Sequence, residues 1–325
     1  MPYTVNSCFD KFRNEAVDLD STRSTTALVS RNNLMTNIDR LSENGRIPVL
    51  YPEKHVAFGS FARKTKIAPL DDIDLMIAIH GQGGHYSVVR HNAEYHIFMP
   101  EDTPILSDFM DGDNLNSRKV INNFRDNLSE LRDYKKAELH RNQEAVTLQL
   151  KSYEWNFDIV PCFYTRQGFY LIPDGNGAWK PTNPQVDKDN VTRANQNYDG
   201  QALQLIRLMK YWKRKNRINI ISSYAFEILI INYVQGRQFY NFPSAVAHAL
   251  RYLSTNLMGV IIDPKGYQGD LNVASFQDKY TASIIAQRDA ETAVKALHAE
   301  ANKDNKSAII FWQQIFGNEF PGYGA

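Results

Sequence analysis

The segment 58–79, FGSFARKTKIAPLDDIDLMIAI, limits the possible folds more than any other part of the chain. It ends in IDLMIAI, a short and nearly continuous apolar run, which is typical of a strand covered on both faces. Three acidic residues, Asp71, Asp72 and Asp74, stand at the start of this run. Carboxylates placed against a sheet are costly unless they are paired or bind a cation, so a partner for this charge is expected.

Side chains alternate between the two faces of a strand, so Asp72 and Asp74 should point to one side and Asp71 to the other. Another acidic residue, Asp158, interrupts the apolar, strand-like run WNFDIVPCF at 155–163. If the two strands are neighbours, the carboxylates of Asp72, Asp74 and Asp158 meet on one face of the sheet. We interpret Asp71 as an exposed charge at the edge of a loop, without a role in the site.

Three carboxylates on one face suit divalent cations with oxygen ligands. Two Mg²⁺ ions, or Mn²⁺ in their place, can activate an attacking hydroxyl and stabilise a departing oxygen. The turn Gly59-Ser60 fits the same site, because glycine lets the backbone approach a phosphate and the serine hydroxyl can donate to it. Taken singly, a Gly-Ser pair is most often a turn, a D-x-D pair a solvated loop or helix cap, and Asp158 a carboxylate bonded to backbone amides. Their order and predicted strand context favour the catalytic interpretation.

The pattern of predicted elements indicates an α+β protein with a mixed sheet followed by a helical region. Apolar spacing predicts a helix over 22–43 and another from Asn116 or Ser117, and the runs 145–151 and 155–163 are expected to pair antiparallel. A polar, Pro- and Asn-rich connection at 173–200 predicts a boundary between a catalytic domain, 1–175, and a helical domain, 176–325. Further helical patterns follow at 201–215, 222–236, 243–257, 282–303 and 308–316.

Composition agrees with a globular protein of about two domains, since 43% of the 325 residues are hydrophobic and 22% are charged. No run of about 18 apolar residues predicts a membrane span, and the first residues lack the pattern of a signal peptide. Two cysteines, Cys8 and Cys162, are too few for a disulfide scaffold, which favours reduced thiols in a cytoplasmic protein. With a net charge of +1 and its densest basic cluster confined to 210–217, the chain is not expected to bind duplex nucleic acid constitutively.

The order Gly59-Ser60, eleven intervening residues, Asp72-Ile-Asp74 and later Asp158 resembles the signature of the polymerase-β-like nucleotidyltransferase superfamily. The longer segment 58–77 is similar to that of the bacterial cGAS/DncV-like nucleotidyltransferases, the signalling synthases of CBASS antiphage systems. The resemblance covers the chain from about residue 22 onward. In the second half it rests on Asn183-Pro184, 200–216, 221–230 and FWQQIFGNEFPGYG at 311–324.

The resemblance implies a bilobed enzyme in which Asp72, Asp74 and Asp158 bind two metal ions. The implied product is a cyclic oligonucleotide, made from nucleoside triphosphates with release of pyrophosphate and used as a diffusible second messenger in antiphage defence. The implied nucleotide-binding residues are Gly59 and Ser60 for the donor triphosphate, Lys210 and Ser223 for phosphate, and Tyr224 for stacking on a base. Without the resemblance, Lys210 would be interpreted as a charge on a helix surface and Tyr224 as a core residue.

Other functions use the same aspartates. Template-independent extension of RNA ends and transfer to proteins or antibiotics are alternatives within the superfamily, and a catalytically inactive nucleotide-binding scaffold is an alternative from another class. The near-neutral charge disfavours RNA extension, and the two distant cysteines cannot form the zinc-bound insertion with which the animal DNA sensor of the wider family grips DNA. The terminal residues 321–325, PGYGA, are expected to form a mobile tail, which is either a frayed end without a function or, as the resemblance implies for some systems, the target of a ligase-like accessory protein. The effector is expected to be reached through the diffusible product.

Overall fold

The strand predicted at IDLMIAI is β2 (Asp72–Ile79), and it belongs to a nine-stranded sheet in the computed structural model, which describes residues 3–325. β2 pairs antiparallel with β1 on one side and in parallel with β9 on the other, and the sheet order is β1-β2-β9-β10-β11-β4-β3. A hairpin of β7 and β8 joins this sheet where β8 pairs antiparallel with β9, as predicted for the runs 145–151 and 155–163. The other strands of this sheet are β1 (Val56–Phe58), β3 (His85–Arg90), β4 (Glu94–Phe98), β7 (Glu138–Asn142), β8 (Ala145–Gln149), β9 (Asn156–Tyr164), β10 (Tyr170–Pro173) and β11 (Trp179–Thr182). A separate pair consists of β5 (Met110–Asp111) and β6 (Asn114–Leu115).

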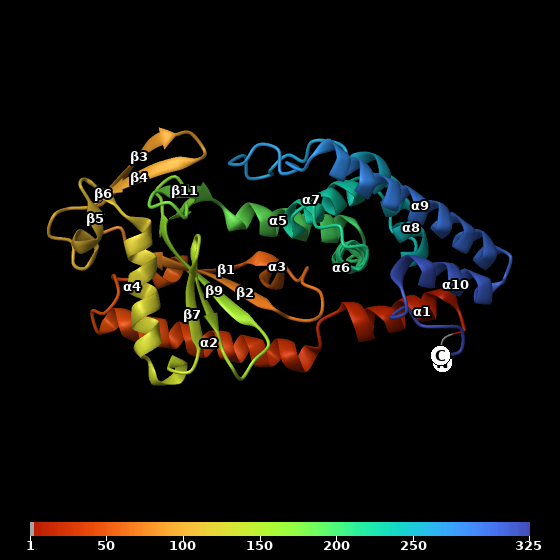
Figure 1. Ribbon diagram of the computed structural model, residues 1–325, viewed down its shortest axis with the longest axis horizontal. Helices are drawn as coiled ribbons and strands as arrows, with labels where there is room; N and C mark the ends of the chain where they lie inside the picture. The colour runs from red at the N-terminus through yellow and green to blue at the C-terminus, as the bar shows by residue number, and fades with distance from the viewer. Residues whose placement is uncertain (1–2) are drawn as a thin grey trace.

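Both faces of β2 are covered, which explains the continuous apolar run. Leu75 and Ile77 face a core that includes α2 (Ser21–Glu43) and α4 (Ser117–Glu130), while Met76 and Ala78 face a smaller cluster with Val160. Both helices begin where the sequence provides a cap: Asp20 accepts from the backbone of Arg23, and Asn116 accepts from Arg118 and Lys119. Figure 1 shows α2 running along the sheet and α4 crossing its outer end.

Helices make up the other half of the molecule (Figure 1). Their apolar faces form one large core, and their first turns are capped by side chains such as Ser222, Asn241 and Ser275. The helices are α5 (Pro184–Asn197), α6 (Ala202–Lys215), α7 (Ser223–Val234), α8 (Phe242–Asn256), α9 (Phe276–Ala301) and α10 (Asn305–Phe316). The predicted α+β architecture with a helical second half is confirmed.

The start of the chain packs with this helical half. α1 (Val5–Phe12) and the π-helical turn Arg13–Val17 that follows it contribute buried side chains to the same core as α6 to α10. Phe9, for example, lies edge-on to Trp312, with ring centroids 5.0 Å apart. Residues 5–17 therefore pack with the helical half, although they precede the domain boundary predicted at 175.

The prediction of an irregular connection over 173–200 is wrong. This stretch contains β11 and α5, with only short turns between them. The Trp179 side chain is fully buried and its Nε1 donates a 2.9 Å hydrogen bond to the carbonyl of Leu115. Asn183 caps α5 and Pro184 occupies its first turn, so the Asn-Pro pair that suggested a loop is a helix start.

The tail predicted to be mobile is instead packed against the N-terminal region. Phe320 is fully buried, the ring of Tyr323 lies edge-on to that of Tyr3 at 5.4 Å, and Lys11 Nζ donates a 3.2 Å hydrogen bond to the carbonyl of Ala325. Cys8 and Cys162 are both free thiols, as predicted, and both are buried. Among residues 3–325, no helix combines the length and apolar character needed to span a bilayer.

Candidate active site

The three aspartates share a face because β2 and β9 pair in parallel. The register sets Asp74 directly beside Asp158 and Asp72 beside Asn156. Paired residues on neighbouring strands point to the same face, and Asp72 lies two positions before Asp74, so all three carboxylates leave the sheet on one side. Each aspartate is only partly buried, which leaves this side open to a ligand. The predicted neighbourhood of the two strands is confirmed.

The carboxylates lie close enough to oppose one another's ionisation. Burial, and then the charges of Asp72 and Asp158, raises the pKa of Asp74 to about 7. Burial and a hydrogen bond with Asp71 raise the pKa of Asp72 to about 6, although Lys66 acts in the opposite direction. Raised pKa values of this origin mark negative charge that the surrounding side chains do not fully neutralise.

Lys66 supplies part of the missing positive charge. Its ammonium, on a side chain that is only 13% exposed, contacts the carboxylates of both Asp71 and Asp72. Asp71 is thus exposed, as predicted, but it is also an ion-pair partner. The sequence interpretation overlooked Lys66, although it lies a few residues upstream in the same segment, because the choice of ion-pair partners depends on the turn between residues 66 and 72.

The oxygen donors of these aspartates fit a magnesium site in which substrate phosphates supply the remaining ligands. Within the described residues, 3–325, no group of three or more His, Cys, Asp or Glu side chains lies close enough together to hold a metal ion alone. Mg²⁺ is commonly held by only one or two carboxylates plus substrate phosphates, and all the donors here are oxygen atoms. Asp158 is already oriented, since Thr147 Oγ1 donates a 2.6 Å hydrogen bond to its Oδ1.

Gly59 makes room for the carboxylate of Asp74. It starts the short helix α3 (Gly59–Ala62) directly after β1, with a φ of +70° that an L side chain rarely adopts. A Cβ at this position would lie 1.7 Å from Asp74 Oδ2. The turn and the aspartate are therefore in direct contact, and only glycine permits it.

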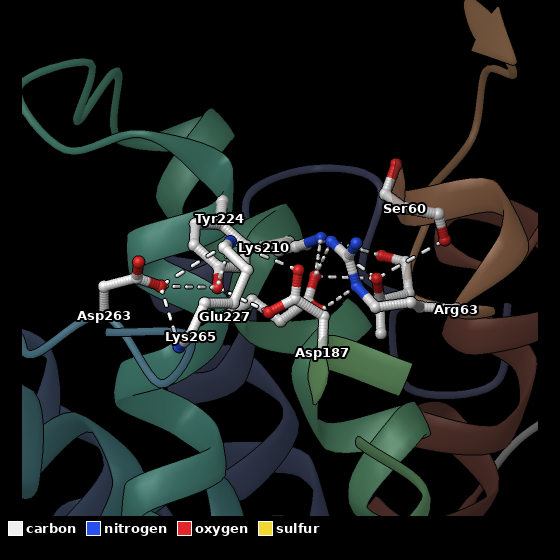
Figure 2. Close-up of polar contacts among 9 residues, drawn as sticks. Ser60, Arg63, Asp187, Lys210, Tyr224, Glu227, Asp263 and Lys265 are labelled. Carbon is white, nitrogen blue, oxygen red and sulfur yellow. Dashed lines mark hydrogen bonds and ion pairs between the residues drawn. The ribbon is translucent and has the colours of Figure 1, made fainter. Parts of the chain in front are cut away.

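The two serines predicted to contact phosphate are positioned at helix starts. Ser60 is the second residue of α3, and in Figure 2 its hydroxyl points away from the neighbouring ion pairs. Ser223 is exposed at the first position of α7, but the capping residue of that helix is Ser222, which accepts from the backbone of Ala225 at 3.0 Å. Neither the Ser60 nor the Ser223 hydroxyl forms a hydrogen bond with the described part of the chain.

Lys210 is buried in an ion-pair network rather than projecting from the helix surface (Figure 2). Its Nζ lies 2.8 Å from Glu227 Oε2 and donates to the carbonyl of Thr65 at 3.1 Å. Arg63 Nε and Thr65 Oγ1 each approach the same carboxylate at 2.7 Å. Burial alone would raise the pKa of Glu227, but the charges of Lys210 and Arg63, with hydrogen bonds from both, lower it to about 2.

This network joins the two halves of the molecule, because Arg63 and Thr65 follow α3 whereas Lys210 and Glu227 lie on α6 and α7. The structure does not bring Lys210 to the aspartates. Glu227 was not among the predicted site residues, although a single carboxylate inside the apolar helix SYAFEILIINYV is the same signal that identified Asp158.

Tyr224 lies in a second polar cluster, next to the first. Its hydroxyl donates to Asp187 at 2.6 Å, lies 3.3 Å from Asp263 Oδ1 and accepts from Lys265 Nζ at 2.8 Å (Figure 2). The Lys265 ammonium also lies 4.1 Å from the centre of the ring, and the Arg63 guanidinium lies 5.7 Å from it. The ring is thus partly buried, packs against the helical core and is flanked by cations.

A cavity of about 760 Å³ adjoins Asp74 and extends between α2, α3 and the start of α5, which is within the size range of small-ligand sites. Its lining includes six Lys and Arg side chains and two carboxylates, Asp18 and Asp74; Arg63, Lys66 and Arg207 form ion pairs with carboxylates. This charge suits a polyanion such as a triphosphate. The cationic lining residues are Arg31, Arg63, Lys64, Lys66, Lys188 and Arg207.

Acidic side chains on one face, a glycine turn against them and a cationic cavity beside them are the components of phosphoryl transfer between nucleotides. The class that this fold and site define is the nucleotidyltransferases. A family model described as "Second Messenger Oligonucleotide or Dinucleotide Synthetase domain" matches residues 79–195. The chain is also 40% identical over 334 residues to a protein of Bacillus cereus (strain VD146) named a probable cyclic nucleotide synthase, and the match covers 99% of both chains. It belongs to the bacterial cGAS/DncV-like nucleotidyltransferases.

More distant relatives agree with this assignment. A cyclic AMP-AMP-AMP synthase of Escherichia coli (strain MS 115-1) is 26% identical over 300 residues, which is 83% of this chain and 84% of that one. Two solved structures have the same fold. The E. coli MS115-1 CdnC:HORMA-deltaN complex has a TM-score of 0.71 at 18% identity, with 98% of each chain covered. The Vibrio cholerae DncV cyclic AMP-GMP synthase, in complex with a linear intermediate, has a TM-score of 0.71 at 10% identity, with 100% of this chain and 98% of that chain covered.

Proposed function

We propose that this enzyme joins nucleoside triphosphates into a cyclic oligonucleotide, with release of pyrophosphate, as a second messenger in antiphage defence. The observation that carries the proposal is the register that sets Asp74 beside Asp158. It gives one face of the sheet the three carboxylates that nucleotide joining requires, with the Gly59 turn in contact with them. The names of the relatives, which are synthases of cyclic nucleotides, support the class of product.

In this mechanism Asp72, Asp74 and Asp158 would hold two Mg²⁺ ions, for which Mn²⁺ can substitute. When bound, the ions supply a lowered pKa for the attacking hydroxyl and neutralisation of the charge on the leaving group. Asp158, held by Thr147, orients a ribose hydroxyl and accepts its proton. The ribose oxygen bonds to the α-phosphorus of the donor as the bond from that phosphorus to the bridging oxygen breaks, and pyrophosphate departs with the electron pair. The linear product then re-enters, and a further transfer closes the ring.

The donor nucleotide is held by the chain's own hydroxyls and cations. The free hydroxyl of Ser60 and the cationic wall of the cavity bind the triphosphate, and Ser223 adds a hydroxyl at the start of α7. Tyr224 presents its ring to a base, a mode of contact that does not depend on the edge of the base. Lys210 contacts phosphate directly only if its ammonium leaves Glu227; in the observed arrangement it fixes the loop at Thr65.

Incubation of the full chain with the four α-³²P-labelled triphosphates and Mg²⁺, followed by phosphatase and mass analysis, tests the proposal. We expect a phosphatase-resistant product whose mass equals a whole number of nucleoside monophosphates less one water for each linkage, including the linkage that closes the ring. A ladder of phosphatase-sensitive chains would instead establish RNA-like tailing. Tight nucleotide binding without any turnover would establish an inactive scaffold.

Replacing Gly59 by Ala is expected to lower synthesis by about a hundredfold, because the new Cβ displaces the carboxylate of Asp74 by an ångström or more. Gly45→Ala is the matched control, since Gly45 has a similar φ of +65° but no atom within 4 Å of an added Cβ. Initial rates and thermal midpoints of both variants separate backbone strain from displacement of Asp74. Equal losses of activity in the two variants would contradict the direct contact.

The response to Mg²⁺ should depend on pH. Burial and mutual repulsion raise the pKa of Asp74 to about 7 and of Asp72 to about 6. Protonation of these carboxylates therefore stabilises the metal-free fold at low pH, and this stabilisation is lost as the pH rises through these values. Mg²⁺ binds the ionised carboxylates, so the stabilisation that it supplies has the opposite pH dependence and increases as the pH rises. We expect MgCl₂ to raise the thermal midpoint more at about pH 8 than at about pH 5.5. If MgCl₂ raised the thermal midpoint equally at both pH values, the ion would bind away from these aspartates.

The resemblance also leads us to propose a protein partner for the C-terminal residues. A ligase-like accessory protein acting on residues 321–325 would have to release them from Lys11 and Tyr3 first. Deletion of these residues without any effect on conjugation would remove this part of the proposal. The effector is reached through the product, and duplex nucleic acid is not required as a trigger.

A further inference from the structure

A second cavity, of about 530 Å³, lies in the helical half, at the ends of α5 and α7 that are remote from the aspartates. It shares no lining residue with the cavity beside Asp74. Figure 1 shows α5, α7 and α8 together in this half. Tyr224 and Tyr233 lie nine positions apart on α7, so the two sites are separated by roughly 14 Å along this helix. The lining residues are Tyr198, Tyr233, Arg237, Gln238, Tyr240, Ser244, Ala245, His248, Arg251, Tyr252 and Thr255.

The lining of this cavity is aromatic and cationic, and none of the described residues that form it carries a carboxylate. The guanidinium of Arg237 lies 4.8 Å from the ring centre of Tyr233 and 5.8 Å from that of Tyr252, and it donates to the carbonyl of Tyr233. Its position is therefore set before any ligand arrives. Contacts with rings and carbonyls leave its charge without an anionic partner among residues 3–325.

One face of α8 adds further polar groups. Ser244, His248, Arg251 and Thr255 recur at intervals of three or four residues, so their side chains lie along the same side of the helix. Arg251 is exposed and makes no ion pair with any residue in 3–325. Tyr240, which also lines the cavity, is 76% exposed, so its ring is accessible to a ligand.

We propose that this cavity binds a nucleotide, with its phosphates at Arg251, His248 and Arg237 and its base on Tyr240. Arginine pairs with phosphate through two parallel hydrogen bonds, and an exposed aromatic ring gains from stacking on any base. A cavity with these two features together selects a ligand that has both an aromatic ring and negative charge. The ligand is bound in addition to the nucleotides that react at the aspartates.

The test counts binding sites with adenosine 5′-(α,β-methylene)triphosphate, whose carbon bridge prevents transfer, by equilibrium dialysis of the full chain. We expect one more equivalent bound by the parent than by Arg251→Glu, in which affinity at the second site falls by about tenfold to a hundredfold. Arg193→Glu is the matched control, because Arg193 is exposed on α5 and lines neither cavity. It should retain the full number of equivalents.

Tyr240→Ala tests the base contact, and inorganic triphosphate, which has no base, is the competing probe. We expect Tyr240→Ala to weaken the second equivalent, and inorganic triphosphate to displace it less effectively than the nucleotide. Equal numbers of equivalents in the parent and Arg251→Glu, or equal losses in Arg251→Glu and Arg193→Glu, would overturn the site. If inorganic triphosphate displaced the second equivalent as effectively as the nucleotide does, the proposal that the cavity binds a nucleotide would be wrong. These results are read from binding alone, so they are distinct from success or failure of the synthesis assay.

Discussion

Replacement of Asp72 and Asp74 together by Asn is expected to lower product formation by at least about a thousandfold, because metal ions contribute several kcal/mol of charge stabilisation in reactions of this type. Asn keeps the size of the side chain and removes the charge that attracts a cation. The fold should survive the change. The pKa values of both carboxylates are raised by burial and by neighbouring carboxylates, so neutral side chains relieve an unfavourable interaction.

Radiolabelled triphosphates measure the loss of synthesis, and thermal unfolding of the same samples measures the fold. Asp71→Asn is the matched control, since Asp71 adjoins Asp72 and shares Lys66 with it, but it precedes β2 and its side chain is exposed, so the prediction that it points to the opposite face is wrong. It should retain activity within a few-fold. Continued synthesis by the double variant would end the catalytic assignment, and a lowered thermal midpoint would indicate that the pair has a structural role.

Glu227→Gln should be among the most destabilising single changes in the helical half. The carboxylate is 1% exposed and accepts from Lys210, Arg63 and Thr65, so its loss leaves two buried cations without a counter-charge. Breaking a buried pair from one side typically costs about 3–5 kcal/mol. We expect the free energy of unfolding, measured by urea titration, to fall by about this amount.

Two further variants identify the cause. Lys210→Met added to Glu227→Gln removes one of the unpaired charges and should restore a substantial part of the lost free energy. Glu291→Gln, at an exposed position of α9, should change it by less than about 0.5 kcal/mol. No recovery in the double variant would mean that Glu227 acts through packing rather than through charge.

The aspartate face was predictable because its determinants are local. A two-residue period decides which side chains of β2 share a face, and the apolar character of β2 and β9 marks both as interior strands. One further assumption, that the two strands are neighbours, sets Asp158 beside Asp74. The helices α2, α4 and α6 to α10 followed from apolar spacing, and α4 and α7 also from a capping residue. The predicted starts of α9 and α10, at 282 and 308, were too late, because these helices begin at Phe276 and Asn305.

What was missed depends on contacts between distant segments. No local pattern shows that α1 packs on α10, or that Lys210 turns inward to Glu227. The error at 173–200 has a different origin, since Asn183-Pro184 is compatible with both a turn and a helix start. Burial of Trp179 under Leu115, which is a tertiary contact, decides between them.

The packing of residues 5–17 with the C-terminal helices means that the backbone passes between the two halves twice. The first passage, at Asp18, is fastened by Arg207, whose Nε lies 2.6 Å from the Asp18 carboxylate; the second is Asn183, between β11 and α5. Any separation of the halves would have to bend the backbone at both points. It would also have to break the buried ion pair of Arg63 with Glu227 and the hydrogen bond from Asn92 to the carbonyl of Gly266, since each joins residues of different halves.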